Sequence, residues 1–396
     1  MIALLACAAI GAGPRILELP DATEDRIVIQ ALAPLPELGD RELAHARILA
    51  EVLSEGTDDY SAATIRRFSS MAGQRLRSTV MPDHIRVQLV VPKGQFATAV
   101  SLIDSILRRA SLAEEAIVAA QKALPYRFNS YWREALDPWV AEYGRLRRED
   151  IVSLYKRAFS PDKLTIAVAG AFVPGEAQAV LAARFEGWTA PRLPSYRPSR
   201  PPKPLFSRTR SVTTIELSSQ VFAANDPQFP QKLMAAIALG TGKASSAWRV
   251  WRDAMGATYR QEAVLWPDAK GFKIRLLAAT LPVDEPEKLG ESMRKGLIED
   301  VDKWNFETLE RTLGMAEGVL LNSIPLSPLY LGGSMPLGDS LEDRAFMAAY
   351  WLMKTGKTFD APSLHAEMRQ IPLEDLQKAA RELLESSVIA VISGSK

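Results

Sequence analysis

Few side chains in this sequence of 396 residues are placed to bind a metal ion or to act as a nucleophile. A zinc pair on a helix needs two ligands four residues apart, so that both lie on one face. His45 has Leu49 at that distance, and His84 and His365 have neither acid nor imidazole at ligand spacing. No local signature of a Ser-His-Asp site, a phosphate loop or a dinucleotide fingerprint is present.

Residues 39–57, GDRELAHARILAEVLSEGT, have the pattern of an amphipathic helix. Asp40 can cap its start, apolar side chains recur at helical spacing from Leu43 to Leu53, and Gly56 ends it. The run LAHARILAEVLSEGT resembles the active-site helix of the pitrilysin, insulinase and mitochondrial processing peptidase superfamily. Members of that superfamily carry an inverted His-x-x-Glu-His zinc motif on this helix.

When LSEGT is aligned with the superfamily's helix, the zinc motif falls on positions 47–51. Arg47 and Glu51 then replace the two histidines, and Ala50 replaces the catalytic glutamate. The superfamily's third zinc ligand is a glutamate on a later helix, which residues 111–128 resemble. No Asp or Glu occurs between Ala116 and Arg133. The resemblance therefore implies a non-catalytic member with no metal ligand and no cofactor, in which zinc is expected only in an active partner. On its own the chain is not expected to be an enzyme.

The length of the chain suits two domains of about 200 residues each. Its 48 basic and 47 acidic side chains are spread along the sequence, which argues against nucleic acid as a partner. The apolar segment 1–13 resembles the core of a secretory signal and is too short for a stable membrane span. It favours a periplasmic or secreted protein, with a buried first strand in a cytoplasmic protein as the alternative. The only cysteine, Cys7, excludes a disulfide within the chain.

An internal repeat indicates how the chain is organised. In each half an acid pair begins a helix that leads to a short apolar strand and a glycine, and an alternating strand is followed by two long helices. We predict an α+β protein with two homologous LuxS- or metallopeptidase-like halves, each a mainly antiparallel sheet packed against helices. The halves are residues 14–190 and 209–396, and the proline-rich segment 191–208 between them is expected to be a semi-rigid linker.

The second half contains LGTGKASSAWRVWRDAMGATY, residues 239–259, which resembles the superfamily's glycine-rich turn, Ser-Ser pair and Gly-x-x-Tyr. In active two-chain relatives an Arg and a Tyr of this region hold the substrate carbonyl. Tyr259 matches the tyrosine, whereas Ala247 occupies the arginine's place and leaves Arg249 and Arg252 as neighbours. The candidate peptide-binding residues are Gly240, Gly242, Lys243, Ser245, Ser246, Arg252 and Tyr259. An ordinary loop with a helix cap would need the same glycines and serines.

The segment 326–341, LSPLYLGGSMPLGDSL, interrupts a helical region with glycines and prolines. It is either a connection between helices or a mobile gate over a cavity.

Three functions remain open from the sequence. The resemblance favours a substrate-binding or regulatory partner of an active zinc peptidase, in a heterodimer or by self-association, that binds extended peptides as an added strand at a sheet edge. A structural or assembly protein, like the core subunits of a respiratory complex, is the second. A peptidase with an unrecognised active site is the third.

Overall fold

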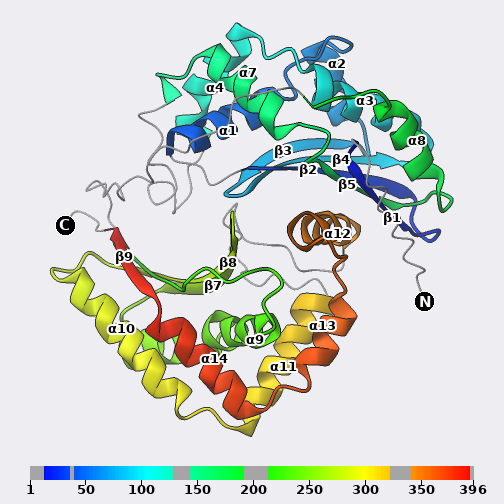
Figure 1. Ribbon diagram of the computed structural model, residues 1–396. Coiled ribbons are helices and arrows are strands. Elements are labelled where there is room, and N and C mark those ends of the chain that lie inside the picture. The colour runs from blue at the N-terminus through cyan, green and yellow to red at the C-terminus, as the bar shows by residue number, and fades with distance from the viewer. Residues whose placement is uncertain (1–12, 36–39, 128–142, 191–212, 322–339, 393–396) are drawn as a thin grey trace. The chain divides into compact units, whose positions relative to one another are not determined.

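The computed structural model describes residues 13–35, 40–127, 143–190, 213–321 and 340–392 (Figure 1). The chain divides into two compact units. One comprises Met1–Lys203 and Leu341–Phe359, and the other Pro204–Ser340 and Asp360–Lys396. Nearly all of the signal-like segment, the linker of residues 191–208 and the proposed gate lie outside the described residues.

The first unit contains a five-stranded sheet in the order β1-β5-β2-β4-β3. Its strands are β1 (Arg15–Pro20), β2 (Arg26–Pro34), β3 (Arg75–Met81), β4 (His84–Pro92) and β5 (Thr165–Gly170). Strand β1 runs parallel to β5, and every other neighbouring pair is antiparallel. Side chains alternate between the two faces, so that Ile29 lies in the main core while Val28 faces the other way.

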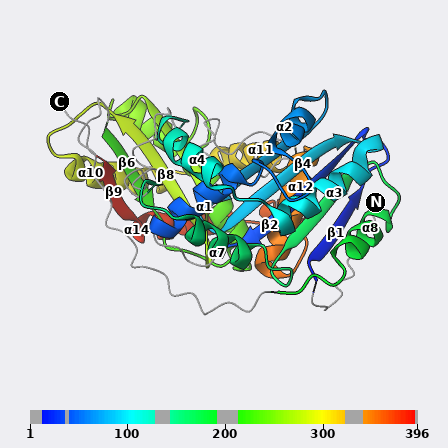
Figure 2. The ribbon, with the colours of Figure 1, turned by 90° about the horizontal axis from the view of Figure 1, so that it is seen from above.

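Helices from the first half of the sequence cover one face of this sheet (Figures 1 and 2). They are α1 (Asp40–Val52), α2 (Ala62–Ser70), α3 (Phe96–Arg109), α4 (Glu114–Arg127), α7 (Arg148–Ala158) and α8 (Glu176–Phe185), with a 3₁₀ turn at Lys93–Gln95. Their apolar faces and the inward side chains of the strands form one buried cluster, the main source of stability for this unit.

The opposite face of the same sheet is covered by a helix from late in the sequence, α12 (Leu341–Thr355). Leu341 and Ala345 pack against Val28, Val90 and Ala169, all of them buried. This helix explains why residues 341–359 cluster with the first unit, although the sequence division placed them in the second half.

A buried polar cluster fixes the far end of α12. Asp83, in the turn between β3 and β4, is 1% exposed and lies 2.7 Å from Nδ1 of His84. The hydroxyl of Tyr350 donates a hydrogen bond of 2.8 Å to Asp83, and the ammonium of Lys354 lies 2.6 Å from the same carboxylate. Burial alone would raise the pKa of Asp83, but the charges and hydrogen bonds of His84 and Lys354 outweigh it and hold the pKa below its usual value.

The second unit contains a four-stranded antiparallel sheet in the order β7-β8-β6-β9. Its strands are β6 (Thr213–Ser218), β7 (Arg260–Asp268), β8 (Gly271–Thr280) and β9 (Val388–Ile392). The helices are α9 (Phe229–Gly240), a π-helical segment (Trp248–Ala254), α10 (Pro286–Val301), α11 (Phe306–Leu321), α13 (Ala361–Met368) and α14 (Leu373–Glu385). Within the described ranges, no helix combines the length and apolarity needed to cross a bilayer.

The predicted α+β class and the duplication are confirmed. Four strands of the first sheet, β5-β2-β4-β3, match the whole second sheet, β9-β6-β8-β7, in order and in antiparallel pairing. The helix-to-strand repeat is also present, since α7 precedes β5 as α14 precedes β9.

Candidate functional site

The helix that resembles the zinc-motif helix is α1, and it is embedded in the first unit. It contacts α4, α7 and strand β3. Ala50 is 6% exposed, and Arg47 and Glu51 are half-buried. The guanidinium of Arg47 donates a hydrogen bond of 3.3 Å to the hydroxyl of the buried Tyr143. These positions therefore take part in the packing of the unit.

The donor set on α1 does not fit zinc. Neither the guanidinium of Arg47 nor the methyl group of Ala50 has a lone pair to donate to a metal ion. Glu51 is therefore the one possible ligand among the three positions. The later helix α4 carries its acids, Glu114 and Glu115, only in its first turn. Across the described part of the chain, no group of three or more His, Cys, Asp or Glu side chains could hold a metal ion.

His45, the one histidine on α1, is buried. The residue is 8% exposed, and Nε2 of its ring lies 3.9 Å from a carboxylate oxygen of Asp150 on α7. His45 therefore contributes to the packing of α1 against α7.

Helix α1 ends at Val52, before Gly56, where the sequence pattern placed its end. The loop that follows is held in place from several sides. Gly56 adopts a φ of 126°, which is the region that favours glycine. Its carbonyl accepts a hydrogen bond of 3.0 Å from the backbone of Ser111, and Thr57 pairs with Ala110 in an isolated β-bridge. The end of the candidate helix is thus tied to the segment after α3.

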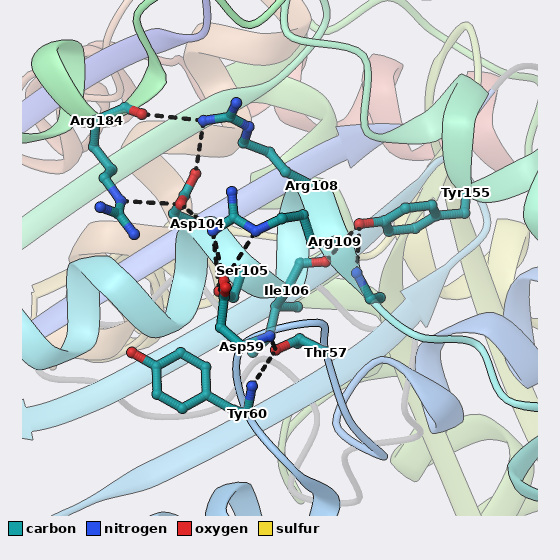
Figure 3. Close-up of polar contacts among 11 residues, drawn as sticks. Thr57, Asp59, Tyr60, Asp104, Ser105, Ile106, Arg108, Arg109, Tyr155 and Arg184 are labelled. Atoms are coloured by element: carbon teal, nitrogen blue, oxygen red, sulfur yellow. Dashed lines mark hydrogen bonds and ion pairs between the residues drawn. The ribbon is translucent and has the colours of Figure 1, made fainter.

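An ion-pair cluster at the end of α3 reinforces this tie (Figure 3). Asp104 is 1% exposed and lies 2.8 Å from Arg109, 2.9 Å from Arg184 and 3.2 Å from Arg108. Arg109 also binds Asp59 of the loop at 2.7 Å, so one guanidinium joins two carboxylates. Sequence reasoning missed this cluster because its members come from three separate segments.

Hydrogen bonds complete the cluster and lower the pKa of Asp59, while burial acts on the neighbouring Tyr155 (Figure 3). The Ser105 hydroxyl and the Arg109 guanidinium donate to Asp59 and hold its pKa below the usual value. The Tyr155 hydroxyl donates to the carbonyl of Ile106 at 2.9 Å, and burial raises the pKa of Tyr155. Both groups therefore keep their ordinary charge at neutral pH and serve to hold the loop.

Strand β3 is the edge of the first sheet beside α1. Its side chains alternate strictly: Leu76 and Val80 pack against the main core, whereas Arg75 and Arg77 are exposed on the other face. Within the described residues no strand pairs with the outer side of β3. An unpaired edge presents backbone N–H and C=O groups that another extended segment can bond.

In the second unit, Gly240 ends α9 and is buried against strand β7. A Cβ atom at this position would lie 2.4 Å from Cβ of Ala263 and 2.5 Å from its backbone nitrogen. Gly240 is therefore required by the close approach of a helix to a strand, and this contact accounts for the residue without a bound peptide.

We expect Gly240→Ala to lower the free energy of unfolding by about 1–3 kcal/mol, because α9 and β7 must separate to admit the methyl group. Urea denaturation of the purified chain would measure the change. The matched control is Gly314→Ala in α11, where an added Cβ atom would have no described residue within 4 Å. That variant should be as stable as the wild type or gain up to about 1 kcal/mol. Equal losses in both variants would contradict this account.

The two serines of the loop after α9 bond within the loop and to residues outside it. Gly242 has a φ of 76°, and its carbonyl accepts a hydrogen bond of 2.8 Å from the Ser245 hydroxyl. The Ser246 hydroxyl donates to Asp300 at 2.6 Å and accepts from the indole of Trp304 at 3.0 Å. Both serines are buried and serve the loop, whereas the Gly242 backbone remains exposed.

A cationic, aromatic surface lies next to this loop. The Lys243 ammonium is 5.7 Å and the Arg252 guanidinium 4.7 Å from the ring centre of Trp248. Arg252 donates a hydrogen bond of 2.7 Å to the carbonyl of Tyr259, whose side chain is 46% exposed. The structure therefore places the cations Lys243 and Arg252 over the ring of Trp248 and ties Arg252 to the backbone of Tyr259. Arg249 is separate, since it pairs with Asp300 at 2.6 Å.

No protein-family model matches the chain, and no curated protein matches its sequence. Its fold does match solved structures. A protease from Helicobacter pylori has a TM-score of 0.75 at 14% identity, with 98% of each chain covered. The peptidase M16 inactive domain from Pseudomonas fluorescens has a TM-score of 0.77 at 12% identity, covering 100% of this chain and 98% of that one.

The periplasmic protease PqqL from Escherichia coli also matches, with a TM-score of 0.67 at 14% identity. The match covers 97% of this chain but 45% of PqqL, which is therefore more than twice as long. At these identities the comparisons establish the fold alone: the chain has the two-unit fold of the M16 peptidases, which occurs in both proteases and a domain described as inactive.

Proposed function

We propose that this protein is a non-catalytic homologue of the M16 zinc peptidases that binds extended peptides as the partner subunit of an active peptidase. The observation that carries the proposal is the composition of α1. Arg47, Ala50 and Glu51 occupy the zinc-motif positions and supply no zinc site, while the two-unit fold around them is retained. A fold kept after loss of its metal site is consistent with a binding role.

Peptide binding is supported by two features, one in each unit. The edge of β3 offers backbone groups to an extended segment, as in other cases of strand addition. In the second unit, exposed Tyr259 and the cations Lys243 and Arg252 offer hydrogen bonds to peptide carbonyls or carboxylates. The exposed backbone at Gly242 allows close approach of a chain.

A partner chain and an extracytoplasmic location complete the proposal. Peptide hydrolysis by a zinc peptidase requires a zinc site, which a homologous subunit with the His-x-x-Glu-His motif would supply in a heterodimer. PqqL, of which the match covers 45%, shows that the fold can be part of a longer chain. The signal-like segment 1–13 supports a periplasmic or secreted location.

Co-expression with a metal-competent homologue tests the proposal. We expect a complex on size exclusion and a peptidase rate at least about tenfold above that of the homologue alone, an effect equivalent to about 1.4 kcal/mol. Tyr259→Ala should remove most of the gain. Phe306→Ala, also at an exposed aromatic side chain of the second unit (69% exposed), should not.

Other outcomes would redirect the assignment. Absence of both a complex and a rate increase would reject the partner role. Stable association with an assembly that has no peptidase would favour a structural protein. About one zinc per purified chain, with hydrolysis that a chelator abolishes, would instead favour a peptidase with an active site of another kind.

A further inference from the structure

The free edge of β3 exposes backbone groups at alternate residues. Strands β3 and β4 are joined by a two-residue turn, with Met81 opposite His84. The pair beside such a turn is hydrogen-bonded, and hydrogen-bonded and non-hydrogen-bonded pairs then alternate along the ladder. Arg75, Arg77 and Thr79 therefore bond to β4. The residues between them, 76, 78 and 80, direct their N–H and C=O groups outward.

The charged side chains of β3, Arg75 and Arg77, are both positive. From Tyr60 to Pro82 the sequence contains four arginines and neither Asp nor Glu. The side chains of Arg75 and Arg77 are exposed, and among the described residues neither guanidinium forms a hydrogen bond or an ion pair. On the same face of the neighbouring strand, Arg86 lies opposite Thr79 and adds a third guanidinium, which bonds Gln30 at 2.9 Å.

The two faces of the edge differ in character. Leu76 and Val80 lie on the face that packs on the main core, next to the helices, whereas the arginines lie on the opposite face. A strand added to β3 would place its side chains alternately on these two faces. Its residues opposite the arginines would have Cβ atoms about 4.5–5.5 Å from theirs, close enough for opposite charges to attract and like charges to repel.

We propose that the β3 edge selects extended segments in which acidic side chains alternate with apolar ones. The acids face Arg75 and Arg77, and the apolar side chains continue the surface of Leu76 and Val80. This inference rests on the proposed peptide-binding function for the docking of a strand, and adds to it the charge and the alternation of the ligand.

Three fluorescent peptides of seven residues, the length of β3, test the selection by anisotropy with the full chain. They alternate Val with Glu, Val with Ser, or Val with Lys. The Glu peptide should bind about fivefold to tenfold more tightly than the Ser peptide, and the Lys peptide most weakly. The preference should decrease as salt rises, because these charges are exposed.

Reversing the charges of Arg75 and Arg77 tests whether these residues cause the preference among the peptides. The double variant Arg75→Glu, Arg77→Glu should invert the order of the three peptides, and the milder Arg75→Gln, Arg77→Gln should abolish the preference without inverting it. The control Arg369→Glu, Lys378→Glu changes the net charge equally at exposed positions of the second unit and should keep the wild-type order. Thermal unfolding would confirm that the variants are folded.

Each contrary result has a distinct meaning. Equal affinity of the wild type for the Glu and Ser peptides would overturn the charge selection and leave peptide binding in place. An inverted order in the control variant would likewise overturn the assignment to β3. Failure of all three peptides to bind would reject strand docking itself, and this inference with it.

Discussion

Asp83→Leu should lower the free energy of unfolding by about 3–5 kcal/mol, because it leaves a buried ammonium without its counter-charge. Lys354 is 11% exposed in its side chain and lies 2.6 Å from the carboxylate that the substitution removes. The hydroxyl of Tyr350 and Nδ1 of His84 would lose the same acceptor. Urea denaturation followed by circular dichroism would measure the loss.

A second substitution separates the ion pair from general disruption of the core. In Asp83→Leu, Lys354→Met both charges are replaced by apolar groups, so this variant should be more stable than Asp83→Leu alone by about 2 kcal/mol. If the double variant lost as much unfolding free energy as Asp83→Leu and Lys354→Met lose together, the two residues would not be coupled.

The same pair predicts a pH dependence. The folded-state pKa of Asp83 is depressed, so its contribution is complete above the unfolded pKa of about 3.9 and is lost as pH falls through the folded value. Wild-type stability should therefore decrease more steeply on acidification below about pH 4 than that of the double variant.

A fragment of residues 1–203 expressed alone should not form a stably folded unit. Without α12, the face with Val28, Val90 and Ala169 is exposed, and Asp83 loses Lys354. Phe346 and Tyr350, at 1% and 0% exposure, would each contribute about 1.5–3 kcal/mol by burial in the intact protein. That loss is a large share of a typical stability of about 5–15 kcal/mol.

Near-ultraviolet circular dichroism and urea titration would show the defect as missing tertiary signal and a non-cooperative transition. Fusing residues 341–359 to the fragment through a Gly/Ser linker should restore both. The matched control is the same fusion with α10, residues 286–301, which should restore neither. Cooperative unfolding of residues 1–203 at wild-type stability would show that α12 is dispensable.

The sequence predicted the parts of the fold that depend on local pattern. The alternating strand predicted in the first half is β4, and the predicted repeat corresponds to the matching sheets of the two units. It did not predict that α12 belongs to the first unit. Amphipathic periodicity shows that a helix has a buried face, but not which of two sheets that face covers.

The candidate site divides in the same way. The loss of zinc ligands could be predicted, because Arg47 and Ala50 lack donor atoms in any tertiary arrangement. The role of Gly240 could not, since it depends on a contact with Ala263 on a separate strand. Among the proposed peptide-binding residues, those exposed in the structure, such as Tyr259, remain candidates. The buried serines already have partners: Ser245 bonds Gly242 within the loop, and Ser246 bonds Asp300 and Trp304 outside it.

The position of α12 has a consequence for synthesis. The chain passes from one unit to the other after residues 203, 340 and 359, so the first unit is complete only when 359 of the 396 residues have been made. During translation its sheet must wait with one apolar face uncovered while most of the second unit is synthesised. The nascent first half is therefore expected to need chaperones, and the first unit can finish folding only after most of the second unit has been made.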